Sequence, residues 1–342
     1  MLAFHKLILV ISFGMLGFLA LYGQVTQQVA REMQVTSWEY SDLSLEEVNQ
    51  LLEEAEADMT KRKALVKSAC VKHNKSEPGV RWERKLVFNG NYFKKHANFY
   101  VDREHNYTYC PVYKAGSTTW FHQMLIMSGK SEEKIDRLKQ PIGKVARAYF
   151  QHSDASEVED VLRKTVKLLI VRHPFERLLS AYRDKLENST AGPEHGSFFY
   201  YRHYGSKMVK LYRNNSSVRQ VEPTFKEFIS YLIHTRETRF EQHWAPFYSS
   251  CLPCAIDYDI IAHAETLNRD QIYIIKKLHL ESLISPLWKR ITYGQRSVGE
   301  TAKKYFKELS KREVQLLYEK FKIDFDLFGY SPDAYFNYAK AQ

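Results

Sequence analysis

Several features that would assign the chain to a known architecture are missing from the sequence. Its 342 residues contain no internal repeat and no low-complexity segment, which excludes solenoid and array folds. Only four cysteines are present, Cys70, Cys110, Cys251 and Cys254. The last two form a C-x₂-C pair, but the first two are 40 residues apart, so no other pair stands at zinc-ligand spacing. The sequence therefore predicts no metal site.

Long apolar runs are scarce, and one stretch approaches the length of a membrane span. Residues 7–23 carry no charge over 17 positions and follow His5 and Lys6. This length is at the lower limit for a transmembrane helix and within the range of a long signal-peptide core. Small residues suited to signal-peptide cleavage are poorly supplied at 20–24, and the positive flank lies N-terminal. We predict a cytosolic tail over 1–6, an uncleaved signal-anchor transmembrane helix over 7–23 and a lumenal remainder; cleaved secretion is the alternative.

Acidic residues are fewer than basic ones, 40 against 50, so the formal net charge is +10. This surplus suits a polyanionic ligand or an acidic glycan, and equally nucleic acid. The predicted anchor and several N-x-[ST] sequons argue against a nucleic-acid partner. The sequons expected to carry glycans are Asn74, Asn188, Asn214 and Asn215; a fifth, Asn106, adjoins a predicted strand and is not expected to be modified. Beyond the anchor and stem, roughly 270 residues remain, enough for one sizeable core.

The stretch 168–186 has the pattern of a strand, a tight turn and a helix. Four strand-type residues lead into Arg172, and a proline stands two residues later, where the helix would begin. Apolar residues then recur at helical spacing, at Phe175, Leu178, Leu179, Tyr182 and Leu186. Arg177, Ser180 and Asp184 fall on the other face. Such a place collects anions, because free N–H groups and the positive end of the helix dipole meet a guanidinium; an ordinary βα unit with a solvated polar side is the alternative.

Another stretch has the pattern of a phosphate cradle. The strand-like residues 107–113 lead into Lys114 and Gly116 and then into an apolar helical pattern. Gly116 lets the backbone approach a ligand, and residues 117–119 offer hydroxyls and successive N–H donors. The loop is not a Walker A motif, because its lysine precedes its only glycine. A nucleotide-dependent kinase is disfavoured for this reason, and because no clear magnesium carboxylate lies near the loop.

Other segments predict the rest of the architecture. Capping boxes at Ser44 and Glu47 and at Ser310 and Glu313 predict two helix starts. The first of these helices either packs on the domain or extends the stem. Further helices are expected over 224–234 and 267–280, a strand over 259–262, and an exposed excursion without apolar period over 187–215. The strands at 107–113 and 168–171 are expected to lie parallel in one sheet, joined by the helical and loop-like residues 131–160.

The two phosphate-binding stretches resemble those of sulfotransferases. Residues 114–120 (KAGSTTW) resemble the 5′-phosphosulfate loop, and residues 171–185 resemble the 3′-phosphate segment. The 171–185 segment is especially similar to that of the Golgi carbohydrate sulfotransferases that make chondroitin 4-sulfate, dermatan 4-sulfate and sulfated glucuronyl epitopes. Further matches follow in the family's order at 240–246, 251–254, 258–261, 265–267 and 325–330. The resemblance spans about residues 105–335, with departures at Tyr113, at residues 117–119 and at His173.

The resemblance implies a fold, a reaction and a location. The fold is α/β, a three-layer sandwich with a central parallel sheet and a P-loop-like phosphate cradle, forming a lumenal domain over 71–342 after a stem and helix over 24–70. The reaction is sulfuryl transfer from 3′-phosphoadenosine 5′-phosphosulfate (PAPS) to a glycan, on a glycosaminoglycan, glycoprotein or glycolipid. C4 of N-acetylgalactosamine in chondroitin or dermatan is the favoured acceptor. The location is the Golgi membrane, as a single-pass type II protein.

The resemblance also assigns roles to residues. Donor binding falls to Lys114, Ala115, Gly116, Ser117, Thr118, Thr119, Arg172, Arg177 and Ser180. Lys114 would sit on the bridging oxygen, where negative charge develops, while Arg172 and Ser180 would bind the 3′-phosphate. Arg177 would assist, or would instead pair with Glu176 or Asp184 along the helix.

A general base and acceptor-binding residues are expected within 240–246 and nearby. His243 is the predicted base, beside Trp244 as a sugar platform; a histidine packed against the Cys251 loop is the alternative. Glu265 would orient His243 or bind the acceptor. In an oxidising lumen the cysteines allow three pairings, of which Cys251–Cys254 with Cys70–Cys110 is preferred over buried free thiols. An inactive, membrane-tethered glycan-binding protein is the alternative function, and the presence of Lys114, Arg172 and Ser180 argues against it.

Overall fold

The computed structural model describes residues 43–74, 99–150, 155–192, 195–213, 220–286 and 298–341. The predicted signal anchor over 7–23 and the sequons at Asn214 and Asn215 lie outside these ranges. Within them, no helix combines the length and apolar character that a membrane crossing requires.

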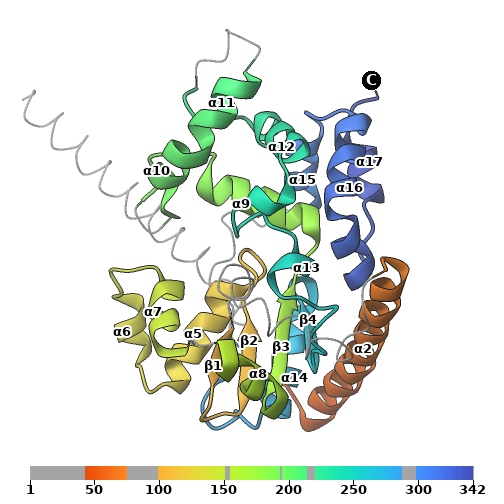
Figure 1. The fold of residues 1–342 in the computed structure, drawn as a ribbon. Helices are drawn as coiled ribbons and strands as arrows, with labels where there is room; N and C mark the ends of the chain where they lie inside the picture. Colours follow the sequence, from red (N-terminus) through yellow and green to blue (C-terminus); the bar gives the residue numbers. More distant parts are fainter. Residues whose placement is uncertain are drawn as a thin grey trace, which may run out of the picture. The chain divides into compact units, whose positions relative to one another are not determined.

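A four-stranded sheet with the order β1-β2-β3-β4 lies at the centre of the domain (Figure 1). Its strands are β1 (Tyr100–Asp102), β2 (Tyr107–Cys110), β3 (Val166–Val171) and β4 (Ile260–His263). β2 pairs parallel with β3, as expected for the strands that precede the two phosphate loops. β3 also pairs parallel with β4. β1 instead forms an antiparallel hairpin with β2, which turns through Asn106 at a φ of 54°. The sheet is therefore mostly, not wholly, parallel.

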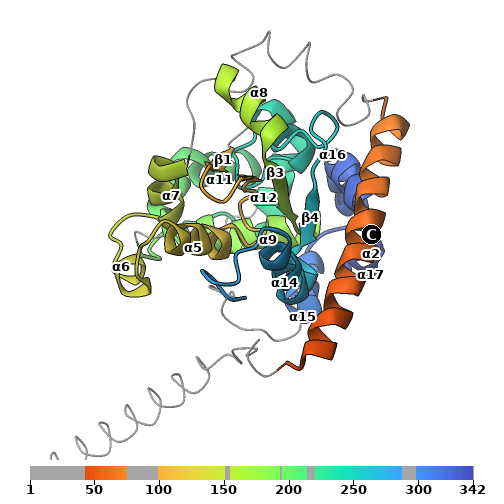
Figure 2. The same ribbon diagram turned by 90° about the horizontal axis from the view of Figure 1, so that it is seen from below.

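Helices cover both faces of this sheet, which gives the three layers that the sequence predicts. Because successive strand residues point to opposite faces, β2, β3 and β4 each contribute to two cores. One core lies beneath α5 (Ser117–Met127) and α14 (Leu267–Lys277) and includes Tyr107, Tyr109, Leu168, Ile170, Ile260 and Ala262. The other includes Cys110, Leu169, Val171 and Ile261, and is covered by parts of α2 (Leu45–Lys72), α8 (Ala155–Lys164) and α16 (Lys311–Phe328) (Figure 2).

A third apolar cluster surrounds α9 (Pro174–Lys185), the helix after β3. The predicted apolar stripe of α9 is confirmed, because Phe175, Leu178, Leu179, Tyr182 and Leu186 are all buried. It packs with α12 (Phe225–His234), α15 (Val298–Phe306), α16 and α17 (Asp333–Tyr338). The polar face of α9 is not part of this apolar cluster and points toward the loops described in the next section. Other helices of the described chain include α6 (Glu132–Asp136), α7 (Ile142–Phe150), α13 (Phe247–Ser250) and the 3₁₀ turns η4 (Glu237–Arg239) and η5 (Ala264–Thr266).

Local sequence signals predicted the long helices well and one segment badly. Both predicted capping boxes form, at Ser44 and at Ser310. The excursion over 187–215 is in part helical: α10 (Ser197–Tyr200), a π-helical turn η3 (Tyr201–Gly205) and α11 (Ser206–Tyr212) follow one another. A π turn takes more residues than an α turn, so it interrupts the 3.6-residue period on which the prediction relied.

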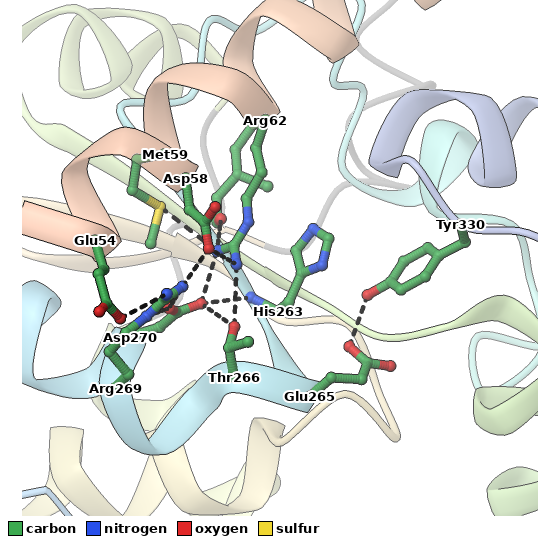
Figure 3. A network of polar contacts seen from close by, with 11 residues as sticks. Glu54, Asp58, Met59, Arg62, His263, Glu265, Thr266, Arg269, Asp270 and Tyr330 are labelled. Atoms are coloured by element: carbon green, nitrogen blue, oxygen red, sulfur yellow. Dashed lines mark hydrogen bonds and ion pairs between the residues drawn. The ribbon is translucent and has the colours of Figure 1, made fainter. Parts of the chain in front are cut away.

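The helix α2 packs on the domain and does not extend a stem. The compact unit begins at Ser44, within the range that the sequence assigned to stem and helix. Arg62 in α2 is buried, and its guanidinium donates to Asp270 Oδ2 at 2.7 Å and to the Ile261 carbonyl at 2.9 Å (Figure 3). These bonds join α2 to α14 and to β4, an edge strand of the sheet.

Asp270 is the centre of this polar network (Figure 3). Its carboxylate is fully buried and also accepts from the His263 N–H at 3.0 Å and from Thr266 Oγ1 at 2.8 Å. Arg269 Nη2 lies 3.0 Å from Asp270 Oδ1. A buried carboxylate is tolerated only when its oxygens are paired in this way. The network therefore fixes the end of β4 and the turn that follows it.

The predicted disulfide pairing is wrong. The structure joins Cys110 to Cys251 and Cys70 to Cys254, with Cα–Cα distances of 5.9 and 5.5 Å, and all four cysteines are oxidised. Cys110 is the last residue of β2, and its partner Cys251 directly follows α13. Cys254 lies three residues after Cys251 and pairs with Cys70, near the end of α2. The turn between Cys251 and Cys254 thus directs the two thiols to different elements, which sequence proximity alone could not reveal.

Asp270→Asn should lower the free energy of unfolding by about 3–5 kcal/mol, because it removes the buried carboxylate 2.7 Å from Arg62 and leaves that guanidinium only the partly exposed Asp58, 3.5 Å away, as a counter-charge. Urea unfolding of the purified protein measures this change. Glu53→Gln, which neutralises an exposed carboxylate on α2, is the matched control and should change stability by less than about 0.5 kcal/mol. Equal stabilities for the two variants would contradict the role given to Asp270.

Candidate functional site

The loop between β2 and α5 is tightly folded around two left-handed residues. Lys114 has a φ of 71° and Gly116 a φ of 87°. A Cβ atom at Gly116 would be strained at this φ and would lie 3.0 Å from Leu267 Cδ2, so a side chain here would require the leucine to shift. Gly116 is also the N-cap of α5, which has no side-chain cap and no acidic residue in its first turn. The start of α5 is therefore suited to bind an anion through its main-chain N–H groups.

Arg172 lies against this loop, as the sequence predicted. Because β2 and β3 are parallel neighbours, their C-terminal ends lie side by side. Arg172 Nη1 donates to the Lys114 carbonyl at 3.3 Å, and Nη2 lies 3.5 Å from Glu176 Oε2. Ser180 is buried farther along α9. The structure thus brings the cation at the end of β3 to the cradle that follows β2.

Arg177 has a different position from the one expected. It is 1% exposed, and burial lowers the pKa of its guanidinium to about 10. It forms neither of the predicted ion pairs with Glu176 and Asp184. Instead it donates to three carbonyl groups, those of Tyr113 at 3.1 Å, Gln242 at 3.3 Å and Ala245 at 2.7 Å. Arg177 therefore links the Lys114 loop to the segment around His243. Its Nη1 has no hydrogen-bond partner among the described residues, and its part in donor binding stays a prediction.

Asp184 on α9 gathers three cationic or titratable groups. Its Oδ2 lies 2.9 Å from Lys114 Nζ and 3.1 Å from Lys185 Nζ, and its Oδ1 lies 2.6 Å from His195 Nδ1. Burial alone would raise the pKa of Asp184, but the two ammonium groups and the His195 hydrogen bond outweigh it and hold this pKa well below its usual range. Burial lowers the pKa of Lys114, and Asp184 opposes this shift. Asp184 thus orients the Lys114 side chain and supports its positive charge.

His243 is held by a carboxylate and a phenol. Its Nδ1 lies 3.0 and 2.9 Å from the two oxygens of Glu241 and 3.0 Å from the Tyr200 hydroxyl. Burial lowers the pKa of His243, and Glu241 works in the opposite direction. Since a carboxylate only accepts, Nδ1 carries the proton in the neutral ring. Nε2, which has no hydrogen-bond partner among the described residues, is then the basic nitrogen.

His243 and Lys114 belong to one continuous group. The ring of Tyr113, the residue before Lys114, lies 4.7 Å from the ring of His243. Lys185 Nζ lies 5.2 Å from the ring centre of Tyr200, which in turn contacts His243. The sequence left open that His243 packs against the loop at Cys251. The rings that contact His243 are instead those of Tyr113 and Tyr200. The arrangement combines an anion cradle, a positioned ammonium group and a buried base.

Two predicted acceptor residues lie elsewhere. Trp244 is fully buried, with its ring 5.1 Å from Tyr204 and 5.7 Å from Phe228. A buried indole cannot stack on a sugar, so the platform assignment is corrected. Glu265 does not contact His243. It accepts from the His173 N–H and the Tyr330 hydroxyl, both at 2.8 Å, beside the end of β3 (Figure 3).

The other predicted positions are residues of the cradle, two glycosylation sequons and His173. Ala115, Ser117 and Thr119 are buried in the cradle, and Thr118 is half-buried. Asn74 and Asn188 are exposed, so glycosylation at both stays a prediction. His173 caps α9 by accepting the Phe175 N–H at 3.2 Å through Nδ1.

Sequence reasoning missed several members of the site. The sequence placed Asp184 on the polar face of its helix and as a possible partner of Arg177, but not as a partner of Lys114. It marked Tyr113 as a strand residue and a departure from the family pattern, but not as a neighbour of His243. Glu241 could have been found, because it stands two residues before the predicted base. Tyr200 carried no such signal, because it reaches His243 from a separate helical segment.

The comparisons with known proteins agree with these features. A family model described as "Sulfotransferase family" matches residues 97–331. Carbohydrate sulfotransferase 11 of Rattus norvegicus is 33% identical over 248 residues, which cover 69% of this chain and 67% of that protein. Carbohydrate sulfotransferase 10 of Gallus gallus is 31% identical over 261 residues, or 70% of each chain. Carbohydrate sulfotransferase 9 of Homo sapiens is 28% identical over 288 residues, covering 81% of this chain and 60% of that protein. No solved structure matches the chain.

Asp184→Asn should destabilise the fold at neutral pH. The depressed pKa of Asp184 means that its contribution is fully present above the ordinary carboxyl pKa of about 3.9 and is lost as pH falls through the folded value. The variant should therefore lose about 2 kcal/mol of unfolding free energy at pH 7 and show a weaker decline in stability below about pH 4. Urea unfolding at several pH values measures both effects.

The control for this experiment is Asp160→Asn, which neutralises an exposed carboxylate paired with Lys164. It should leave stability within about 0.5 kcal/mol of the wild type. A wild-type pH dependence in Asp184→Asn would show that the carboxylate is not held ionised by the lysines.

Proposed function

The chain belongs to the sulfotransferase family and is a carbohydrate O-sulfotransferase, and we propose that it transfers a sulfuryl group from PAPS to a sugar hydroxyl by in-line displacement. The observation that carries this proposal is the meeting of the Lys114 loop and Arg172 at adjacent strand ends. A helix start without a side-chain cap, a glycine in the left-handed conformation, and two cations fit a ligand with several anionic groups.

The residues present fit the two phosphates of such a donor. The N–H and hydroxyl groups of residues 117–119 would hold the 5′-phosphate. Arg172 and Ser180 would bind the 3′-phosphate, which distinguishes this donor from an ordinary adenine nucleotide. When bound, the donor supplies the sulfuryl group and a phosphate leaving group.

Lys114 would stabilise the charge that develops on the leaving oxygen. Its ammonium group is held by Asp184 at 2.9 Å, so little reorganisation is needed during the reaction. Fixed charges of this kind contribute most when they are oriented in advance. Arg177 supports this arrangement indirectly, because it holds the Tyr113 carbonyl next to Lys114.

His243 would remove the proton from the acceptor hydroxyl at Nε2. Burial lowers the pKa of His243, which keeps the ring neutral and able to accept a proton near neutral pH. Glu241 fixes the tautomer and stabilises the imidazolium that forms, the role that a carboxylate has in a catalytic triad.

The acceptor and location follow from the sequence resemblance. C4 of N-acetylgalactosamine in chondroitin or dermatan is the proposed acceptor, supported by the likeness of residues 171–185 to enzymes of that class and by the net charge of +10. A lumenal domain anchored in the Golgi membrane through residues 7–23 is proposed in addition. Both disulfides fit an oxidising compartment.

The proposed reaction is tested by transfer of ³⁵S label from PAPS to chondroitin, desulfated dermatan, heparosan and glucuronyl-terminated glycans. We expect label on one glycan and a loss of about 100-fold or more in Lys114→Ala. Lys61→Ala, on the exposed face of α2, should retain wild-type activity. If no glycan is labelled and 3′-phosphoadenosine 5′-phosphate does not bind, the proposal fails and the inactive glycan-binding protein is favoured.

The pH dependence of the rate tests the proposed base. Because burial lowers the pKa of His243, kcat/KM should fall on the acid side with an apparent pKa below the ordinary histidine value of about 6.5. Glu241 raises the pKa of His243, so Glu241→Gln should move this limb to lower pH. His243→Gln should lose about 100-fold or more in rate and show no such limb.

The control variant for the pH profile is Glu319→Gln, at an exposed position of α16, which should leave the profile unchanged. An acid limb that stays in place in Glu241→Gln, or that persists in His243→Gln, would mean that another group accepts the proton.

A further inference from the structure

The helical segment Ser197–Tyr212 has a buried side and an exposed side. Its buried side includes Ser197, Gly205 and Met208. Gly205 is closely packed, since a Cβ atom there would lie 3.1 Å from Tyr201 Cδ2 and 3.2 Å from Pro223 Cδ. The exposed side, here called the 198–211 face, consists of Phe198, Phe199, Arg202, His203, Lys207, Lys210 and Leu211.

The 198–211 face is basic and has no acidic residue. No aspartate or glutamate occurs between His195 and Arg213. Arg213 is neutralised by Glu227, which it contacts at 2.8 and 2.9 Å. By contrast, Arg202, Lys207 and Lys210 have no ion pair within the described part of the chain. Among the described residues, nothing therefore neutralises the positive charge of this face, which suits a polyanion.

Two large aromatic rings are exposed on the same face. Phe198 is 63% exposed and Phe199 52% exposed. The Phe199 ring stacks on His203 at 4.0 Å, and Arg202 lies 5.9 Å from the centre of the Phe198 ring. Exposed apolar side chains that lie next to one another on a surface often mark an interaction site. Aromatic faces of this kind can pack on the apolar side of a sugar ring.

A row of rings connects this face to the proposed base. Phe199 lies 5.4 Å from Tyr200, and Tyr200 lies 5.3 Å from His243. The Tyr200 hydroxyl also lies 3.0 Å from His243 Nδ1. The π-helical turn follows Tyr200 directly, and such turns occur often at functional sites. The exposed face and the reaction centre are thus connected through Tyr200, and α11 lies beside α12 (Figure 1).

We propose that the 198–211 face binds the acceptor as an anionic polysaccharide strand and leads its reacting sugar to His243. This inference rests on the proposed function and adds the surface that selects the acceptor. Lys207, Lys210 and Arg202 would contact carboxylate or sulfate groups along the strand. Phe198 and Phe199 would pack against sugar rings near the reacting unit.

An anionic membrane is the other polyanion that a basic and aromatic segment could contact. The structure favours the glycan, because the face is continuous with the Tyr200–His243 contact. A bilayer seated on these residues would cover the approach of the acceptor to the base. Binding to lipid is therefore treated as a competing outcome of the experiment.

The test compares two double variants with the same change in charge. Lys207→Ala/Lys210→Ala alters the 198–211 face, and Lys61→Ala/Lys67→Ala alters exposed positions of α2. In the full chain, the variant of the face should raise KM for a chondroitin-type polymer about tenfold with kcat and the affinity for 3′-phosphoadenosine 5′-phosphate unchanged. The increase should shrink at high salt, because exposed charges are screened. The α2 variant should keep the wild-type KM.

A binding measurement separates failure of this inference from failure of the proposed function. All proteins are applied to immobilised chondroitin sulfate and to vesicles of phosphatidylserine and phosphatidylcholine. Earlier elution of Lys207→Ala/Lys210→Ala from the glycan supports the inference even if the wild type transfers no sulfate. Elution and KM equal to those of the α2 variant overturn it, and so does a loss confined to the vesicles.

The aromatic part of the face is tested by Phe198→Ala/Phe199→Ala. Both rings are exposed, so the fold should be retained, and a thermal melt checks this. KM for the polymer should rise severalfold while the salt dependence of KM keeps its wild-type slope. An unchanged KM would remove the two rings from the proposed surface.

Discussion

Burial of the Arg177 guanidinium is the constraint on which the rest of the site depends. A buried cation is costly unless its N–H groups find acceptors. Arg177 Nε and Nη2 donate to three main-chain carbonyls, those of Tyr113, Gln242 and Ala245, while Nη1 has no partner among the described residues. Its Cζ also lies 4.7 Å from the centre of the Phe247 ring. These carbonyls belong to the Lys114 loop and to the segment that carries His243. One side chain therefore fixes the anion cradle against the proposed base.

Electrostatic organisation around Asp184 depends on this framework. Lys114, Lys185 and His195 converge on a single carboxylate, which is possible only because α9 runs between the cradle and the helical segment that follows it. The carboxylate limits the mutual repulsion of the cations while leaving a net positive site. Since the first turn of α5 adds N–H donors, the local field favours a ligand with more than one anionic group.

The part of the site that follows strand and turn patterns could be predicted from the sequence. The part that depends on contacts between segments far apart in the chain could not. Lys114 and Arg172 were found because each follows a strand pattern, and parallel strands bring their ends together. Arg177 shares the polar face of its helix with Ser180, and only the folded chain shows that carbonyls from two distant loops surround it. Trp244 was predicted to be a sugar platform because it follows His243 in the sequence. Its ring is buried by residues of α12 and α10, which the sequence around Trp244 does not reveal. The partner of Cys254 likewise lies 184 residues away, beyond the reach of any spacing argument.

The central claim is that the Lys114 loop and Arg172 form one site that binds both the 5′-phosphate and the 3′-phosphate of the donor. It is tested most directly by calorimetric titration of the full chain with 3′-phosphoadenosine 5′-phosphate and with adenosine 5′-phosphate, in the wild type and in Arg172→Ala. We expect the wild type to prefer the nucleotide with the 3′-phosphate by about 10- to 100-fold, since one charge-assisted contact is worth about 1.5–3 kcal/mol. The variant should lose this preference and keep its affinity for adenosine 5′-phosphate. Equal affinity of the wild type for the two nucleotides, or a preference that survives in Arg172→Ala, would contradict the claim.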